Sequence, residues 1–65
     1  MSEEKLKFKS PLLIAAQKGG EGLLSLSKKV KNKRTAEEMH RHALAILELC
    51  AVVQRLADED LNQVN

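Results

Sequence analysis

The chain has 65 residues, a net charge of +2, one cysteine and one aromatic residue, Phe8. A domain of this length buries only about 60% of the surface of its extended chain and usually depends on disulfides, a metal ion or a partner subunit. A single cysteine excludes an intrachain disulfide, and Cys50, His40 and His42 are too few soft ligands for a structural zinc site. The composition therefore predicts stabilisation by oligomerisation, and the lack of aromatic residues argues against a stacking platform for single-stranded nucleic acid.

The charge is divided unevenly along the chain. Residues 1–34 carry nine Lys/Arg and three acidic residues, whereas residues 35–65 carry two Lys/Arg and six acidic residues. An anionic partner is one interpretation, but we favour two halves that lie side by side and neutralise each other. The charged first residues and the short apolar cluster at 12–16 predict no secretory signal. We therefore expect a cytoplasmic protein, in which a lone reduced thiol is ordinary.

The first nine residues alternate lysines with Leu6 and Phe8, and period-two alternation is typical of a strand. A strand this short cannot form a sheet alone. We expect a flexible arm over residues 1–9 whose Leu6 and Phe8 dock on the rest of the domain, residues 10–65. A short strand paired across a dimer axis is the alternative.

Ser10 and Pro11 predict the start of a first helix, with the serine as N-cap and proline at the first helical position. The pattern extends to about residue 31. Its apolar positions are spaced by threes and fours, as in a coiled coil: Leu12, Ala16, Gly19, Leu23, Leu26 and Val30. Three glycines in this stretch each cost about 1 kcal/mol relative to alanine. Either one helix continues through residues 19–22, which we favour, or the helix breaks there; a phosphate-binding role for the glycines lacks the context of a P-loop.

A basic turn comes next, made of Lys28, Lys29, Lys31, Lys33 and Arg34. Asn32 is expected in the left-handed conformation that ends a helix. Thr35 is expected to cap the second helix, with Glu38 completing a capping box. A connection this short predicts an antiparallel hairpin.

The second helix is predicted over about residues 36–62, because no Gly or Pro interrupts this stretch. Its inner line of apolar residues ends at Leu61 or Val64. A narrow polar strip of Glu37, Arg41, Glu48, Arg55 and Glu59 allows ion pairs between Glu37 and Arg41 and between Arg55 and Glu59. The remaining circumference is mostly apolar, although residues 43–57 are too short to span a membrane, which needs about 20 apolar residues.

The first helix can cover only one side of this apolar surface. An exposed patch of that size drives association, so we expect an all-α antiparallel hairpin that dimerises into a four-helix bundle. The predicted core and dimer interface comprises Met39, Ala43, Ile46, Leu47, Leu49, Cys50, Val53, Leu56 and Ala57.

No constellation of residues indicates catalysis, so we expect neither an enzyme nor a cofactor. His40 and His42 point in different directions on a helix and cannot chelate one metal ion. Glu37 and His40 match the carboxylate–histidine spacing of di-iron bundles, with Glu21 as the only further carboxylate, but we favour a solvated role. Cys50 is expected to behave as a small buried hydrophobe.

The sequence favours a small, non-enzymatic interaction or regulatory module that acts as a homodimer and binds another protein. Small accessory proteins of phages and mobile elements are similar in size and simplicity, which is an analogy only. The alternative is a nucleic-acid-associated regulator whose basic turn, Lys28 to Arg34, contacts phosphates. We expect no interaction with a membrane.

Overall fold

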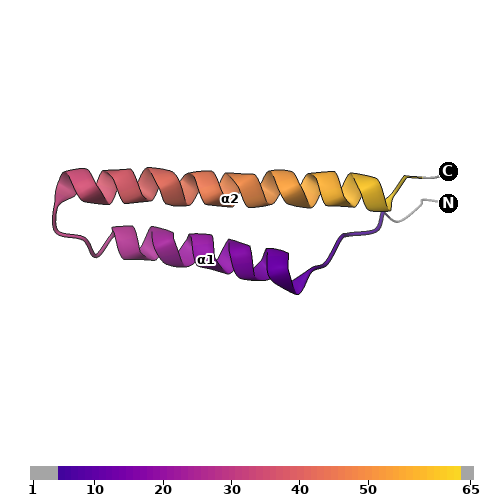
Figure 1. Ribbon diagram of the computed structural model, residues 1–65, viewed down its shortest axis with the longest axis horizontal. Helices are drawn as coiled ribbons and strands as arrows, with labels where there is room; N and C mark the ends of the chain where they lie inside the picture. The colour runs from indigo at the N-terminus through magenta and orange to yellow at the C-terminus, as the bar shows by residue number, and fades with distance from the viewer. Residues whose placement is uncertain (1–4, 64–65) are drawn as a thin grey trace.

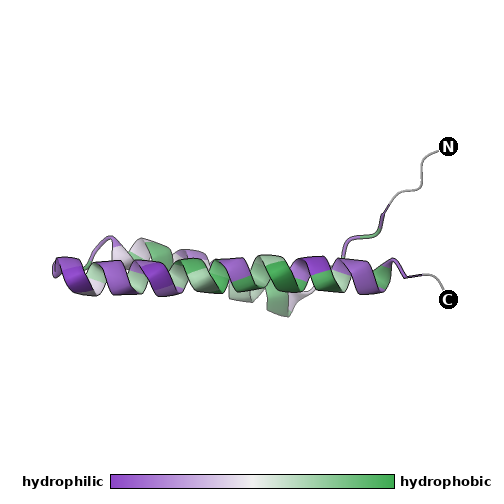
Figure 2. Cartoon of the chain, turned by 90° about the horizontal axis from the view of Figure 1, so that it is seen from above, coloured by the Kyte–Doolittle hydropathy of each residue, from purple (hydrophilic) through white to green (hydrophobic). Residues whose placement is uncertain are grey.

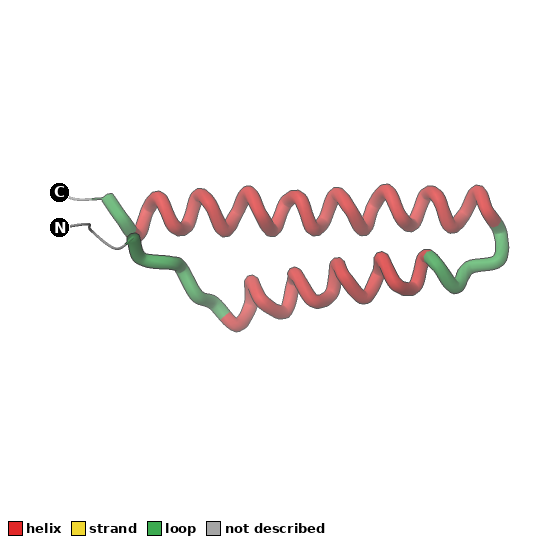
Figure 3. The backbone as a smooth tube through the Cα atoms, turned by 180° about the vertical axis from the view of Figure 1, so that it is seen from behind, coloured by secondary structure: helices red, strands yellow, loops and turns green. Residues whose placement is uncertain are grey.

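The computed structural model describes residues 5–63 and shows two antiparallel helices side by side (Figures 1 and 3). Helix α1 spans Pro11–Ser27 and helix α2 spans Lys33–Leu61. The two helices pack against each other in an elongated body of 54 × 20 × 17 Å. The prediction of an all-α helical hairpin is therefore confirmed. The first four residues of the predicted arm and the alternative core position Val64 lie outside the described residues.

Helix α1 runs without a break through its three glycines, so the single-helix alternative is correct. It begins after Ser10, whose backbone is extended (φ −141°, ψ 128°), as is usual before a proline. The Ser10 side chain does not make the expected capping hydrogen bond. The fixed φ of Pro11, which suits the first helical position, is thus the main start signal.

The buried glycine of α1 is Gly20, and it explains why glycine is placed inside a helix. A Cβ atom at Gly20 would lie 2.8 Å from Cδ2 of Leu47 and 3.2 Å from Cγ2 of Ile46. The same construction at Gly19 and Gly22 meets nothing within 4 Å. Gly20 is therefore the one of the three glycines that packs directly against side chains of α2, with no room for a Cβ atom.

The turn between the helices differs from the prediction at both ends. Helix α1 ends at Ser27 rather than near residue 31, and α2 begins at Lys33 rather than near residue 36. The Ser27 hydroxyl is buried and donates to the Leu24 carbonyl oxygen at 2.6 Å. The backbone N–H groups of Lys28 and Lys29 bond three residues back, to Ser25 and Leu26, which tightens the end of the helix.

Asn32, and not Thr35, is the N-cap of α2. Its backbone is extended (φ −74°, ψ 116°), and its side-chain Oδ1 accepts from the Thr35 backbone N–H at 3.0 Å. The left-handed conformation expected of Asn32 is therefore wrong. An asparagine that caps the next helix satisfies one of that helix's free N–H groups, and the chain turns without any positive φ between residues 5 and 63.

The core of the described hairpin is thin and is built from small residues. Gly20 and Ser27 of α1 and Ala43 and Cys50 of α2 are buried. Leu13, Leu24, Met39, Ile46, Leu47 and Ala57 are half-buried around them. No large side chain between residues 5 and 63 is fully buried. Small side chains at the contact let the helices approach closely, but they remove little apolar surface from water.

The line of α1 residues that faces α2 is shifted by one position from the predicted line. Leu13, Gly20, Leu24 and Ser27 face inward, whereas Leu12, Leu23 and Leu26 of the predicted line are exposed. Both lines have the spacing of a helix face, and the inward one contains Gly20, where a Cβ atom would meet Leu47 at 2.8 Å. The apolar residues of the predicted line are left on the surface.

Candidate interaction surfaces

Three polar side chains, two from the last turns of α2 and one from its C-cap residue, hold the extended arm, residues 5–9, against the end of the helix. We call Gln54, Asp58 and Asn62 the polar ladder, because they lie on successive helical turns. The Asn62 side chain accepts from the Leu6 N–H at 2.9 Å and donates to the Leu6 carbonyl oxygen at 2.8 Å. Asp58 Oδ1 accepts from the Phe8 N–H at 2.6 Å, and Gln54 Nε2 donates to the Phe8 carbonyl oxygen at 2.7 Å.

The spacing of the ladder matches that of an extended chain. Four residues of an α-helix rise about 6 Å, and two residues of an extended strand advance about 6.7 Å. Side chains four apart on α2 therefore meet backbone groups two apart on the arm, which runs antiparallel to the helix. All four hydrogen bonds between the ladder and the arm are made to backbone groups of the arm, and none is made to its side chains.

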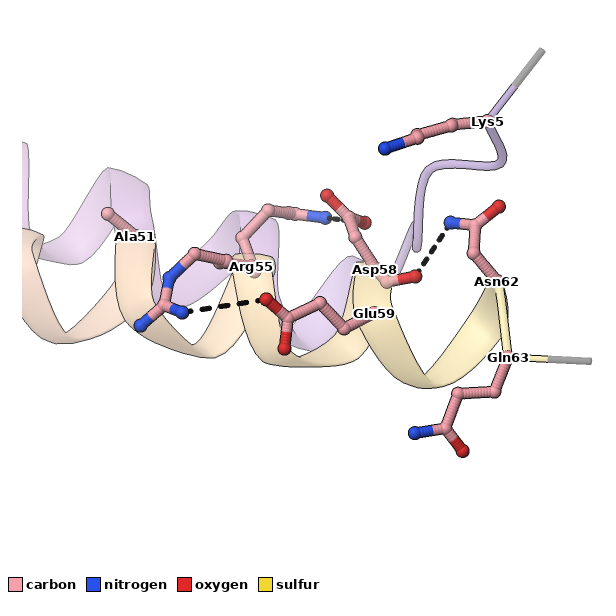
Figure 4. A pocket seen from close by; sticks show the side chains of 8 residues that line it. Lys5, Ala51, Arg55, Asp58, Glu59, Asn62 and Gln63 are labelled. Carbon is pink, nitrogen blue, oxygen red and sulfur yellow. Dashed lines mark hydrogen bonds and ion pairs between the residues drawn. The ribbon is translucent and has the colours of Figure 1, made fainter. Parts of the chain in front are cut away.

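The ladder is braced by bonds between its own members (Figure 4). Gln54 Nε2 also donates to Asp58 Oδ1 at 2.9 Å, and Asn62 Nδ2 donates to the Asp58 backbone carbonyl at 2.7 Å. The Phe8 N–H, and secondly the Gln54 amide, hold the pKa of Asp58 below its usual value, with a smaller effect from the positive charge of Lys7. Asp58 therefore binds the arm in its ionised form.

An open pocket of about 550 Å³ lies beside the ladder. It is lined by the ladder, by Lys5 of the arm and by the exposed ion pair between Arg55 and Glu59, whose N···O distance is 3.5 Å. Figure 4 shows Lys5 on the same side of α2 as Asp58 and Asn62. The predicted Arg55–Glu59 pair is thus confirmed, whereas Arg41 pairs with Glu38 rather than with Glu37.

The second surface is an apolar face shared by both helices. On α1 it comprises Leu12, Leu23 and Leu26, and on α2 it comprises Leu49, Val53 and Leu56. These residues fall on one side of each helix at 3.6 residues per turn. All six are more than two-fifths exposed, and Leu12 reaches 83% and Leu49 61%. Figure 2 shows that apolar residues dominate the middle of α2 and hydrophilic residues its start near the turn.

A groove of about 380 Å³ confirms that the two helices contribute to the same face. It is lined by Leu12, Leu13 and Ala16 of α1, by Leu49, Cys50 and Val53 of α2, and by Phe8 and Ser10. The arm crosses from the start of α1 to the end of α2 (Figure 1), and its residue Phe8 lines the groove. Phe8 therefore belongs to two surfaces, because its backbone is held by the ladder and its side chain lines the apolar groove.

The structure distributes the nine predicted core and interface residues over three environments. Ala43 and Cys50 are buried against α1. Met39, Ile46, Leu47 and Ala57 are half-buried, and Leu49, Val53 and Leu56 are exposed on the apolar face. The inner positions thus pack within the hairpin, and the outer three are available to a further partner.

The basic turn forms the third surface. Lys28, Lys29, Lys31, Lys33 and Arg34 are all exposed, and none of them is in an ion pair with another described residue. Lys28 and Lys29 follow the negative end of α1, where cations are favourable. Lys33 and Arg34 occupy the first turn of α2, where the helix dipole disfavours positive charge.

The described residues contain no group of three side chains able to hold a metal ion. Glu37 and His40 line an open pocket of about 270 Å³ with Ser27, and His42 Nε2 lies 3.9 Å from Glu38. Cys50 is a free, buried thiol. Neither described helix is long and apolar enough to cross a membrane.

Sequence reasoning missed the polar ladder. The signal was present as three hydrogen-bonding side chains with i, i+4, i+8 spacing, set beside an arm with period-two alternation. Either pattern alone is common, and only their combination indicates a helix that holds an extended chain. Comparison with protein-family models, with curated proteins and with solved structures found no match for this chain.

Proposed function

We propose that the protein is a non-enzymatic interaction module that acts as a homodimer, in which the apolar faces of two hairpins pack into a four-helix bundle. The observation that carries the proposal is the set of exposed leucines and valine on one side of the hairpin. As a small helical accessory module it would present its remaining charged surfaces to another protein. The analogy with accessory proteins of phages and mobile elements rests on size alone.

The large solvent-exposed surface of the single hairpin supports a partner that covers part of it. The chain exposes 5845 Å², whereas a folded monomer of 7.2 kDa is expected to expose about 4,100 Å². The excess is roughly 1,700 Å², or twice what each partner buries in a standard interface. A second copy with an interface of standard size would cover about half of this excess.

The shape of the apolar face also favours a second copy. A two-fold dimer needs one self-complementary patch, and a strip of leucines along both helices provides it. Gly19 lies on this side of α1 between Leu12 and Leu23, and nothing lies within 4 Å of the position of its missing Cβ. The small residue leaves room for a side chain of a partner helix to approach the backbone.

The dimer is tested by analytical ultracentrifugation of the wild-type protein and of Leu49→Glu at micromolar concentration. Leu49 is exposed in the single hairpin, so a glutamate costs little there but places an unpaired charge in the proposed interface. We expect a wild-type dimer and a folded Leu49→Glu monomer with the same helical circular dichroism.

Leu44→Glu is the matched control. Leu44 is 45% exposed and, five residues from Leu49, points about 140° away from it on the helix. We expect this variant to remain dimeric. A folded wild-type monomer at micromolar concentration, or equal dissociation of the two variants, would contradict the proposal.

A second candidate function is binding of nucleic acid through the basic turn. The specific observation is that Lys33 and Arg34 stand at the positive end of α2 and form no ion pair with another described residue. This placement opposes the helix dipole, and an anionic ligand would relieve it. In a dimer, two such turns would contact phosphates.

Reversal of all five charges of the basic turn tests this candidate. We expect the wild type to retain duplex DNA or RNA in a filter-binding assay at low salt, and the reversed variant to lose at least tenfold in affinity. Lys18→Glu, on the exposed surface of α1, serves as a control for a general charge effect. Partner capture that is insensitive to nuclease and unchanged by the reversal would reject this candidate.

A further inference from the structure

The polar ladder contacts its occupant only through groups that every peptide has. Leu6 and Phe8 each offer a backbone N–H and a carbonyl oxygen, and all four groups are bound by Asn62, Asp58 and Gln54. Recognition of this kind depends on an extended conformation and on the two-residue repeat, as in peptides added to the edge of a sheet. The identity of the arm residues is therefore not required by the ladder itself.

The arm is a weakly held occupant. The Leu6 side chain is 57% exposed and that of Phe8 is 38% exposed, and the four hydrogen bonds between arm and ladder are open to solvent. Hydrogen bonds exposed to water add little net stability, because water replaces them readily. Another extended chain that makes the same backbone hydrogen bonds could thus compete with the arm.

Charge selects the kind of peptide that fits. Asp58 is ionised, Glu59 and Asp60 follow it, and all three stand at the C-terminal end of α2, where the helix dipole favours cations. The arm that occupies the site carries Lys5, Lys7 and Lys9 between its apolar residues. Lys5 of the arm lines the open pocket beside the ladder together with Asp58 and Glu59, so a basic side chain already lies next to these carboxylates.

We propose that Gln54, Asp58 and Asn62 form a binding site for an extended, lysine-bearing peptide segment of a partner protein, which the arm occupies in cis and which such a segment displaces. Apolar residues at every second position of the segment would take the places of Leu6 and Phe8, the second of them beside the groove of Leu12, Leu49 and Val53. The ladder residues lie outside the apolar face, whereas the groove beside Phe8 shares Leu12, Leu49 and Val53 with the proposed dimer interface.

The test uses the full chain with the arm released and the arm sequence itself as probe. In the variant Leu6→Pro/Phe8→Pro, both N–H donors to the ladder are removed and only the two carbonyl acceptors remain, so the arm competes less well for the ladder. The probe is a fluorescent peptide of residues 5–10, KLKFKS. We expect saturable binding to this variant by anisotropy, at least tenfold tighter than to the wild type, in which the tethered arm competes at high effective concentration.

Two controls separate ladder binding from simple charge attraction. Asn62→Ala added to the proline variant is expected to weaken binding at least tenfold, whereas Gln17→Ala, on the exposed surface of α1 and outside the ladder and its pocket, is expected to leave binding unchanged. A probe with proline in place of its leucine and phenylalanine keeps the same charge and is expected not to bind.

A second measurement covers the case in which the proline variant loses its helical circular dichroism. The wild type is then titrated with the unmodified probe, and the side-chain amide signals of Asn62 and Gln54 are followed by NMR. Saturable shifts of these signals, absent with the proline probe, support the proposal. No shift at millimolar probe, no binding to a folded proline variant, or equal binding of both probes would overturn it, whatever the oligomeric state.

Discussion

Asn32 shows how a single residue decides where α2 begins. Asn32 and Thr35 are three apart, the spacing of a cap and the N–H group that it accepts from, and Thr35 and Glu38 repeat this spacing one turn later. Both pairs fit the rules for helix starts, so the sequence could not distinguish them. The structure uses the first pair, which extends α2 by nearly one turn and places Lys33 and Arg34 inside the helix.

Asn32→Ala is expected to destabilise the fold by about 1 kcal/mol, the usual effect of losing an N-cap side chain. Thr35→Ala is expected to be neutral or slightly stabilising, because Thr35 contributes only its backbone N–H to the cap and alanine is the better helix former. Urea denaturation followed by circular dichroism gives both values. A greater loss of stability in Thr35→Ala than in Asn32→Ala would indicate that Thr35 is the N-cap.

Asp58 makes attachment of the arm dependent on pH. Its pKa is lowered in the folded chain, chiefly by the Phe8 N–H, so the ionised carboxylate binds the arm more strongly than the protonated form does. The contribution is complete above the ordinary carboxyl pKa of about 3.9 and is lost as the pH falls through the lowered value. We expect the Phe8 amide proton signal to move toward that of an unbound arm in acid.

Asp58→Asn is the control for this titration. The asparagine can still accept from the Phe8 N–H but does not ionise in this range, so the movement of the Phe8 signal below pH 4 should disappear. A Phe8 signal that titrates equally in both proteins would show that another group controls the arm.

Helix α1 shows why the packed face of an element was harder to predict than the element itself. Its start at Pro11 and its continuity could be inferred from the sequence, but two neighbouring lines of residues both have helical spacing. The line with more leucines looks like the core, yet the structure buries the one with Gly20 and Ser27. Close packing of two helices favours small residues at the contact. A search for hydrophobic residues at helical spacing does not detect positions such as Gly20 and Ser27.

Substitution of the glycines of α1 tests the close approach. Gly22→Ala is expected to stabilise the hairpin by about 0.5–1 kcal/mol, because the new methyl group meets nothing and alanine favours the helix. Gly20→Ala gains the same helix propensity, but its new Cβ atom would lie 2.8 Å from Cδ2 of Leu47. The Leu47 side chain must therefore move, which costs about 1–3 kcal/mol in a packed site. Thermal or urea denaturation should therefore rank Gly22→Ala above Gly20→Ala.

Equal stabilisation by the two alanines would mean that Leu47 rotates away without cost, and that Gly20 is not needed for packing. Gly19→Ala is a different probe, because Gly19 lies on the apolar face. A loss of dimer without a loss of monomer stability in that variant would place a partner helix against Gly19.

On the scale of the whole molecule, the sequence predicted the architecture but not all of its surfaces. The helical hairpin follows from two long periodic segments and one short polar connection, which leave few other arrangements. The polar ladder depends on residues 46 to 56 positions apart in the chain, and no local pattern specifies such a pairing. These long-range polar contacts could therefore be found only from the three-dimensional structure.

The thin core predicts that the stability of the whole molecule depends on its concentration. Dissociation precedes or accompanies unfolding when the folded state is a dimer, so the Tm should rise with protein concentration. We expect a clear rise in the wild type between 1 and 100 μM (on the order of several degrees) in scanning calorimetry. Leu49→Glu should show a lower Tm that does not change over this range, and a constant wild-type Tm would argue against the dimer.

The arm's attachment also has a consequence for the order of folding. The bonds between Leu6 and Asn62 join positions 56 residues apart, so in an unfolded chain they close a loop that takes in nearly all of the described residues. Once α1 and α2 have paired, the same ends are already neighbours, and little further entropy is lost when the arm attaches. The arm should therefore be the last segment to settle and the first to open. Its amides would then exchange hydrogen long before those at the Gly20 contact.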